Sequence, residues 1–228
     1  MKSTHRTPRA ARLAVVAILL CLATPAQAVK ITGRYTLSKA GKSFARSSFT
    51  LVMKSDQSAV GSEFITAPKK RELFGGFIQL RPKFALDKFR VRFGGKVLRT
   101  EFLFRYKKAF KIRSLRGEKA KVADITVEPN AVILEPDLIL PYVLLVRRYN
   151  LAQKGTQSFP YVVVSTRKNG TLSVAYQSLS EGQAKHLLTV SGMGWSAKLT
   201  LGEKKLLLKI ETDKFVATHP SLAPKKTN

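Results

Sequence analysis

The chain has 228 residues, of which 41 are lysine or arginine and 14 are aspartate or glutamate, and its formal net charge is +27. A charge of this size predicts a strong attraction for anions. Of its three histidines, only His186 and His219 follow residue 28. Metal centres and histidine-based catalysis need several such ligands or bases at set spacings. We therefore predict no catalytic residues, no metal site and no cofactor.

Residues 1–28 have the organisation of a secretory signal peptide. A basic segment precedes the apolar run 13–22, and Ala26-Gln27-Ala28 supplies a small-x-small cleavage site. A transmembrane anchor is less favoured because the apolar run is short and ends at Thr24-Pro25. Cleavage after Ala28 would remove the single cysteine, which excludes disulfides, and would leave a net charge of +23. The protein is therefore expected in the periplasm or secreted.

Most of the following chain alternates apolar and polar residues with a period of two, which is typical of half-buried strands. Before residue 130 the expected strands are 31–37, 43–54, 59–66, 77–86, 89–93, 102–106, 110–113 and 120–127. Pro82 lies inside the fourth of these segments and indicates an edge strand or a bent strand. Gly94-Gly95 predicts a hairpin turn between the fifth and sixth segments.

The apolar segment 135–149 is the one stretch that reads as a helix. Asp137 is expected as its N-cap, Pro141 falls in the first turn, and Arg147 and Arg148 complement the dipole at its C-terminus. The residues between them are apolar on every face, which is typical of a helix buried all round. A buried strand over 142–146 is the alternative.

Beyond the helix, the pattern returns to strands at 157–165, 172–176, 195–201 and 206–210. Asn169-Gly170 is the strongest turn signal because both residues tolerate positive φ. Gly192–Ser196 predicts a bend beside a buried tryptophan, since its serine is misplaced for a nucleophile elbow. We expect a mainly β fold, an antiparallel curved sheet or barrel of about ten strands that encloses one short apolar helix. Residues 29–218 form one domain, and 219–228 form a flexible tail.

The segment from Lys88 to Lys121 is the most basic part of the chain, with 13 lysine or arginine residues and 2 acidic residues. Because its cations alternate with aromatic residues, we expect the cations on one face of the sheet and Phe89, Phe93, Phe104 and Phe110 largely on the other. Such a face either keeps the sheet soluble or binds anions. The candidate ligand-binding residues are Arg90, Arg92, Arg105, Lys107, Lys111 and Arg113, with Tyr142, Leu145 and Tyr149 of the helix.

The pattern Tyr149-Asn150-x-x-x-Lys154-Gly155-x-Gln157-x-Phe159 after the apolar helix resembles a group of uncharacterised exported bacterial β-rich proteins. The expected architecture is also similar in shape to the Lol-type lipoprotein carriers. In those carriers a curved antiparallel sheet with a helical lid shelters acyl chains. This resemblance implies a non-enzymatic binding protein of the cell envelope, with an anionic lipid or other amphiphile as its ligand.

Two kinds of function are compatible with these features. In the first, the helix lines or covers a cavity for acyl chains and the basic strands attract the headgroup. In the second, an interaction protein docks to an anionic envelope surface, an acidic polymer or a partner through the basic face alone, and its interior is filled. Nucleic acid is not expected as a partner after export. A hydrolase is less favoured because no nucleophile–base pair is evident, and a membrane-embedded barrel because the strands carry many charges.

Overall fold

The computed structural model describes residues 28–67, 72–94, 98–179 and 182–222. The predicted signal peptide lies outside these residues except for Ala28. The described chain is mainly β, with fifteen strands and one α-helix. The first eight strands are β1 (Val29–Lys39), β2 (Lys42–Met53), β3 (Ala59–Thr66), β4 (Glu72–Arg81), β5 (Ala85–Phe93), β6 (Arg99–Tyr106), β7 (Ala109–Arg116) and β8 (Lys119–Ile125).

The second half of the chain begins with a two-residue strand and the helix. Its elements are β9 (Val132–Ile133), α2 (Leu140–Arg148), β10 (Thr156–Val163), β11 (Lys168–Ser178), β12 (His186–Ser191), β13 (Ala197–Leu201), β14 (Leu207–Thr212) and β15 (Val216–Thr218). Three short 3₁₀ helices accompany them, η1 (Pro82–Phe84), η2 (Glu203–Lys205) and η3 (Pro220–Leu222). The predicted tail therefore begins with a 3₁₀ turn, and residues 223–228 lie outside the described chain.

All fifteen strands belong to one sheet, in the order β8-β7-β6-β5-β4-β3-β2-β1-β15-β14-β13-β12-β11-β10-β9. The first and last strands of the described chain pair with each other in its middle, where Thr36 lies opposite Thr218. Each pair is antiparallel except β9 with β10. The outermost strands, β8 and β9, are not paired with each other, so the sheet is open. The expected count of about ten strands was too low, because no strand was expected at β9, β12 or β15. β9 and β15, with two and three residues, are too short to carry a recognisable pattern.

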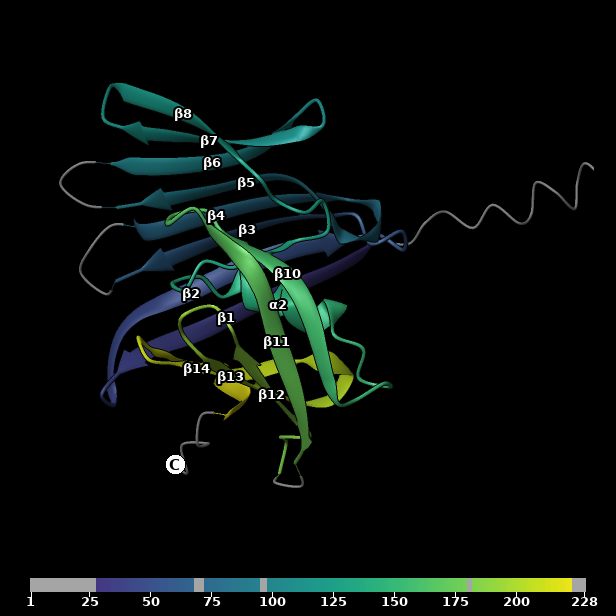
Figure 1. Cartoon of the computed structure of the whole chain (residues 1–228). Helices are drawn as coiled ribbons and strands as arrows, with labels where there is room; N and C mark the ends of the chain where they lie inside the picture. Colours follow the sequence, from purple (N-terminus) through teal and green to yellow (C-terminus); the bar gives the residue numbers. More distant parts are fainter. Residues whose placement is uncertain (1–27, 68–71, 95–97, 180–181, 223–228) are drawn as a thin grey trace, which may run out of the picture.

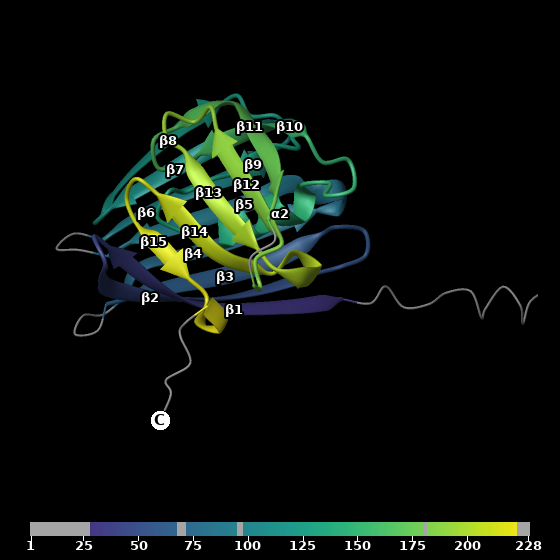
Figure 2. The ribbon, with the colours of Figure 1, turned by 90° about the horizontal axis from the view of Figure 1, so that it is seen from below.

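The sheet curves over so that its two ends form two layers. In Figure 1 the strands β10 and β11 cross in front of the layer formed by the first strands, and α2 lies between the layers. Figure 2 shows the same curvature from below, with the yellow strands β13–β15 continuing from β1. The sheet therefore has a concave inner face, which holds the core, and a convex outer face.

The prediction of an apolar helix buried all round is confirmed. Every residue from Leu140 to Val146 is buried, and Tyr142 and Leu145 have no exposed surface. Pro141 lies in the first turn, while Arg147 and Arg148 lie in the last. The helix fills the space between the two layers of the sheet, so it is the centre of the hydrophobic core rather than a lid over it.

Asp137 does not cap this helix, which contradicts the sequence prediction. The N-cap position is Ile139, and the groups that need acceptors are the backbone N–H groups of Ile139 and Leu140. Both donate to the carboxylate of Glu63 on β3, at 2.9 and 2.7 Å. Asp137 lies outside the helix with a carboxylate oxygen 3.7 Å from Lys214 Nζ. A long-range contact therefore replaces the local cap, since the buried N–H groups need an acceptor wherever it comes from.

Two local predictions, the turn at Asn169-Gly170 and the bent or edge strand at Pro82, were also wrong. Asn169 and Gly170 lie inside β11, where Gly170 is opposite Tyr161 and approaches its ring closely. The turn between β10 and β11 is formed instead by residues 164–167, with Arg167 at a φ of 59°. Pro82 does not lie inside a bent strand but follows the end of β4 and begins η1, so the boundary between the strands expected at 77–86 and 89–93 lies at residues 82–84 instead.

Candidate anion-docking face

The outer face of β4–β7 carries a row in which aromatic and cationic side chains alternate. Phe77 lies opposite Arg90, Arg90 opposite Phe102, and Phe102 opposite Arg113, so the row crosses four neighbouring strands. Side chains opposite each other on one face of a sheet are in contact range, about 5 Å between Cβ atoms. The residues between them in sequence, such as Phe89 and Leu103, are buried on the inner face. We call this surface the outer basic face.

A second row runs beside the first on the same face. Lys88 lies opposite Phe104, Phe104 opposite Lys111, and Lys111 opposite Asp124 on β8. Lys111 forms an ion pair with Asp124 at 3.1 Å and also lies over the ring of Tyr106. This row therefore repeats the alternation of cation and aromatic ring, but one of its two lysines is neutralised by a carboxylate.

The aromatic rings hold at least one arginine in place. The guanidinium of Arg90 lies 5.9 Å from the centroid of the Phe77 ring, within the range of a cation–π contact. Arg92, two residues after Arg90 on β5, lies opposite Gly75 on β4 and Thr100 on β6. Among the ion pairs of the described residues, none involves Arg90, Arg92 or Arg113. These three arginines are therefore available to an external anion.

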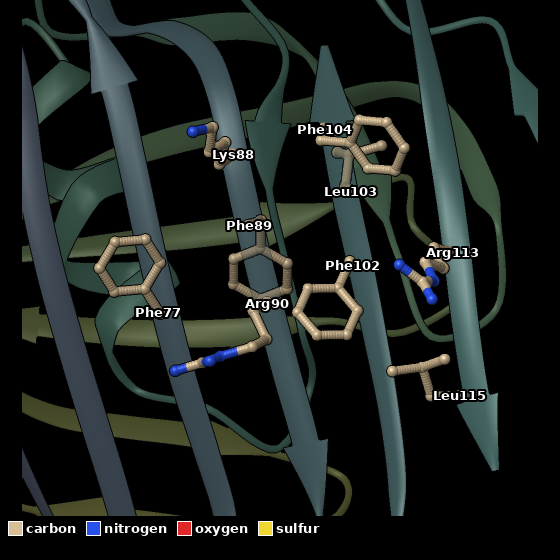
Figure 3. A pocket seen from close by; sticks show the side chains of 9 residues that line it. All are labelled: Phe77, Lys88, Phe89, Arg90, Phe102, Leu103, Phe104, Arg113 and Leu115. Atoms are coloured by element: carbon tan, nitrogen blue, oxygen red, sulfur yellow. The ribbon is translucent and has the colours of Figure 1, made fainter. Parts of the chain in front are cut away.

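The outer basic face is hollowed rather than flat. A depression of about 600 Å³ has Phe77, Arg90, Phe102 and Arg113 among its lining residues, and Figure 3 shows these side chains on neighbouring strands. A second depression of about 350 Å³ shares Phe77, Arg90 and Phe102 with the first and extends to Phe64, whose side chain is 50% exposed. The two depressions therefore form one shallow groove with apolar walls and unpaired cations.

Of the six basic residues predicted to bind a ligand, the structure places four on the outer basic face and two at its end. Arg90, Arg92, Lys111 and Arg113 lie on the outer basic face. Arg105 instead lies opposite Phe110, a residue of the inner face, and its Nε donates to the Lys107 carbonyl oxygen at 3.3 Å.

Lys107 is in the turn between β6 and β7, with Nζ 5.7 Å from the centroid of the Tyr106 ring. Four of the six basic residues therefore share one surface, while Arg105 and Lys107 lie at its end.

The prediction that the phenylalanines lie opposite the cations holds for Phe89 and Phe110, which are buried inside. It is wrong for Phe104, which shares the outer face with Lys88 and Lys111. The reason is that β6 contains the continuous apolar run 102–104, in which alternation cannot indicate which residues face outward. For the same reason the sequence does not indicate that Phe102 faces outward. Phe77 lies before the basic segment 88–121, so its place beside Arg90 is evident only from the strand pairing.

The three candidate ligand-binding residues predicted in segment 135–149 lie in the core. Tyr142, Leu145 and Tyr149 have no exposed surface. The Tyr142 hydroxyl accepts a hydrogen bond from Trp195 Nε1 at 3.3 Å, and the Tyr149 hydroxyl donates to the Gly155 carbonyl oxygen at 2.7 Å. Neither depression of the outer basic face includes them. The two tyrosine hydroxyl groups thus form hydrogen bonds within the protein.

Two buried carboxyl groups hold the segment 135–140 in place, Glu63 by binding its end and Glu135, its first residue, by binding Ser165. Glu63 accepts from Ser47 Oγ at 2.6 Å as well as from the helix N–H groups, and burial raises its pKa to about 7. Glu135 accepts from the Ser165 N–H at 2.8 Å, and burial likewise raises its pKa to about 7. Desolvation outweighs the hydrogen bonds, which by themselves favour the charged form. Both groups are enclosed and do not reach the outer basic face.

Within residues 28–67, 72–94, 98–179 and 182–222, no three histidine, cysteine, aspartate or glutamate side chains are grouped as metal ligands would be. In the same part of the chain, no helix has the length and hydropathy needed to cross a bilayer. No protein-family model matches the sequence, and comparison with the curated proteins and with the solved structures finds no match.

Proposed function

We propose that this protein docks to anionic lipid surfaces of the cell envelope through the outer basic face, as a non-catalytic binding protein. The observation that carries the proposal is the alternation of aromatic rings and unpaired cations across four neighbouring strands, the row Phe77, Arg90, Phe102 and Arg113. Cations near an anionic membrane contribute about 1 kcal/mol each, and phenylalanine is among the residues that bury at the boundary between headgroups and acyl chains. A shallow groove that presents both suits a headgroup layer.

The alternative, a cavity that encloses acyl chains beneath the helix, is less well supported. The residues that would line such a cavity, Tyr142 and Leu145, have no exposed surface, and α2 occupies the space between the layers. A docking face requires no such space. The predicted signal peptide at 1–28 would bring the protein to the compartment in which this surface meets lipid headgroups.

The test compares binding to vesicles with and without negative charge. Mature protein beginning at residue 29 is sedimented with phosphatidylcholine vesicles, neutral or containing phosphatidylglycerol, at low and high salt. We expect binding to the anionic vesicles only, and loss of that binding at high salt because exposed charges are screened. Arg90→Gln/Arg113→Gln should lower the affinity at least tenfold.

The matched control is Lys39→Gln/Lys198→Gln, which removes the same charge from two exposed positions on other strands. It should reduce the affinity by less than threefold. Equal losses in both double variants would mean that net charge alone attracts the protein, and the outer basic face would then have no special role. Failure of the unaltered protein to bind anionic vesicles would overturn the proposal altogether.

A further inference from the structure

The opposite face of β6–β8 holds a second group of cations, near the turn between β10 and β11. Arg99 lies opposite Arg116, and Arg116 lies opposite Lys119, so three positive side chains form one row across three strands. Like charges directly opposite each other destabilise a sheet. A row of three like charges therefore lowers the stability of the sheet, and the row itself contains no acidic residue that would offset the repulsion.

The next row places one carboxylate beside these cations. Glu101 lies opposite Ser114, which lies opposite Lys121. The Glu101 side chain is buried, accepts from Arg99 Nε at 2.8 Å and also accepts from the Ser114 hydroxyl. Its charge is thus already engaged by Arg99. Among the described residues, no carboxylate pairs with Arg116, Lys119 or Lys121.

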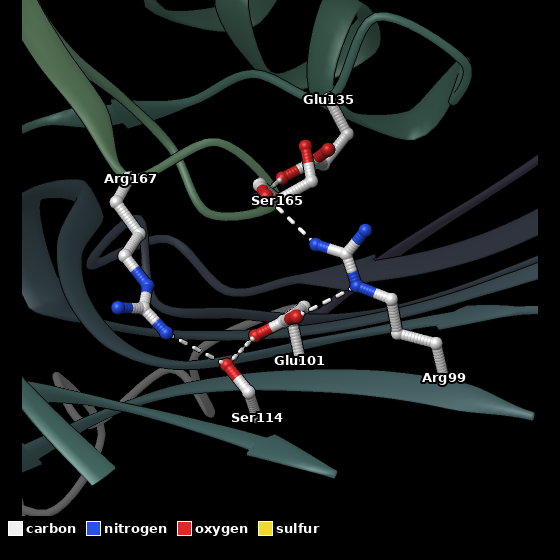
Figure 4. A network of polar contacts seen from close by, with 6 residues as sticks. All are labelled: Arg99, Glu101, Ser114, Glu135, Ser165 and Arg167. Carbon is white, nitrogen blue, oxygen red and sulfur yellow. Dashed lines mark hydrogen bonds and ion pairs between the residues drawn. The ribbon is translucent and has the colours of Figure 1, made fainter. Parts of the chain in front are cut away.

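The second layer of the sheet closes this group from the other side. Arg167, from the turn between β10 and β11, donates to Ser114 Oγ at 3.1 Å. Arg99 donates to the Ser165 carbonyl oxygen at 2.9 Å, and Ser165 N–H donates to the buried Glu135 (Figure 4). These hydrogen bonds connect the two layers, so the arginines are held in place instead of moving freely in solvent.

The result is a hollow of about 610 Å³ between the layers. It is lined by five cations, Arg99, Arg116, Lys119, Lys121 and Arg167, and by the single carboxylate of Glu101. Glu118 in the adjoining turn is exposed and is not among the lining residues. A surplus of four positive charges around one hollow creates a local field that favours an anion with more than one charge.

We propose that this hollow binds a multivalent phosphate group. Guanidinium groups match the geometry of phosphate oxygens through paired N–H donors, and lysines add point charges. The bound anion would lie between Arg116, Lys119 and Lys121 on one layer and Arg167 on the other. It would neutralise the repulsion within the row of like charges. The cations of this hollow differ from those of the outer basic face and lie on the opposite face of the strands, because successive residues of a strand point to opposite faces. Leu115 lines both hollows, so the two sites are neighbours.

The experiment measures binding of pyrophosphate and of inorganic phosphate by calorimetry and by the shift in melting temperature, with sodium chloride at equal ionic strength as reference. We expect pyrophosphate to raise the melting temperature beyond the chloride reference and to bind more tightly than inorganic phosphate. Arg116→Gln/Lys119→Gln should weaken pyrophosphate binding at least tenfold. The same variant should melt at a higher temperature than the unaltered protein when no phosphate is present, because the repulsion is relieved.

Two further measurements distinguish a lipid phosphate from a soluble one, and distinguish binding at this hollow from docking through the outer basic face. Arg90→Gln/Arg113→Gln should leave pyrophosphate binding unchanged, whether or not vesicle docking occurs. If the phosphate belongs to a lipid headgroup, Arg116→Gln/Lys119→Gln should also lower binding to vesicles that contain phosphatidic acid. If the phosphate is a soluble one, vesicle binding should fall by no more than in Lys39→Gln/Lys198→Gln, which removes the same charge. A pyrophosphate response equal to that of chloride, or one that persists fully in Arg116→Gln/Lys119→Gln, would overturn the inference.

Discussion

The carboxylate of Glu63 accepts a hydrogen bond from the backbone N–H of Leu140, 77 residues later in the chain, at 2.7 Å. The same carboxylate accepts from the N–H of Ile139 and from the Ser47 hydroxyl. A strand residue therefore caps the helix that fills the core. Because all of these groups are buried, the contact fixes where the helix begins and how it is placed against β2 and β3.

Removal of this cap should destabilise the protein strongly. Glu63→Ala would leave two helix N–H groups and the Ser47 hydroxyl without their acceptor and would open a cavity. We expect a loss of about 3–5 kcal/mol in the free energy of unfolding, measured by urea denaturation. Asp137→Ala is the control, since Asp137 is the cap that the local sequence favours. It should cost less than about 1 kcal/mol, and a larger loss there than at Glu63 would contradict the structure.

Stability should depend on pH through Glu63 and Glu135. The pKa of each carboxyl rises from an ordinary value of 4.5 to about 7 in the folded protein. Below pH 4.5 both the folded and the unfolded state are protonated. Between 4.5 and 7 only the unfolded state loses its proton, so the free energy of unfolding falls as the pH rises, by about 3 kcal/mol for each group.

Glu135→Gln isolates one of these contributions. Glutamine cannot titrate, yet its carbonyl oxygen can still accept from the Ser165 N–H. The decrease in stability between pH 5 and pH 8 should therefore be smaller in this variant than in the unaltered protein, by about 2.5 kcal/mol. An identical pH profile in the two proteins would show that Glu135 is charged in the fold throughout that range.

The C-terminal end of α2 depends on a lysine from η2. Lys205 Nζ donates to the carbonyl oxygens of Tyr149 at 2.7 Å and Arg147 at 3.3 Å. Lys205→Ala should lower the free energy of unfolding by about 1.5 kcal/mol, since a charged donor to the last helix carbonyls is lost. Lys204→Ala is matched to it, because Lys204 is exposed and both residues have positive φ, 53° and 59°. The control should change stability by about 0.5 kcal/mol or less.

Phe102 and Phe89 test the assignment of the two faces. Phe102→Ala on the outer basic face should reduce vesicle binding several-fold and cost about 1 kcal/mol of stability or less. Phe89→Ala on the inner face should cost about 3–5 kcal/mol, because Phe89 is buried in the core. Thermal denaturation and vesicle sedimentation of the two variants give the comparison. Loss of stability at Phe102 as large as that at Phe89 would place both rings in the core.

Several features follow from the local sequence because they depend on neighbouring residues. Alternation of apolar and polar residues predicts the strands, as in β1 and β2, and the uniformly apolar segment after Asp137 predicts a buried helix with Pro141 in its first turn. The charge of the segment from Lys88 to Lys121 is likewise evident from composition. Export and lipid binding stay predictions, and the predicted signal peptide on which export depends lies outside the described residues except for Ala28.

Other features depend on which strands become neighbours. The run of apolar residues in β6 does not indicate that Phe102 faces outward between Arg90 and Arg113, because that depends on the register of three strands. Nor does a local turn signal at Asn169 compete with the pairing of β10 and β11, in which Gly170 makes room for Tyr161. Burial and pairing outweigh local preference at these positions.

The sequence by itself determined the mainly β character, the position of the central helix and the large positive charge, since each is a property of short segments or of composition. Only the tertiary structure decided that Glu63 caps this helix and that Arg99, Arg116 and Lys119 form one row. The physical reason is that hydrogen bonds act over about 3 Å, and charge repulsion between exposed groups acts over about 10 Å, in space. The folded sheet, rather than proximity in the chain, brings these groups within those distances.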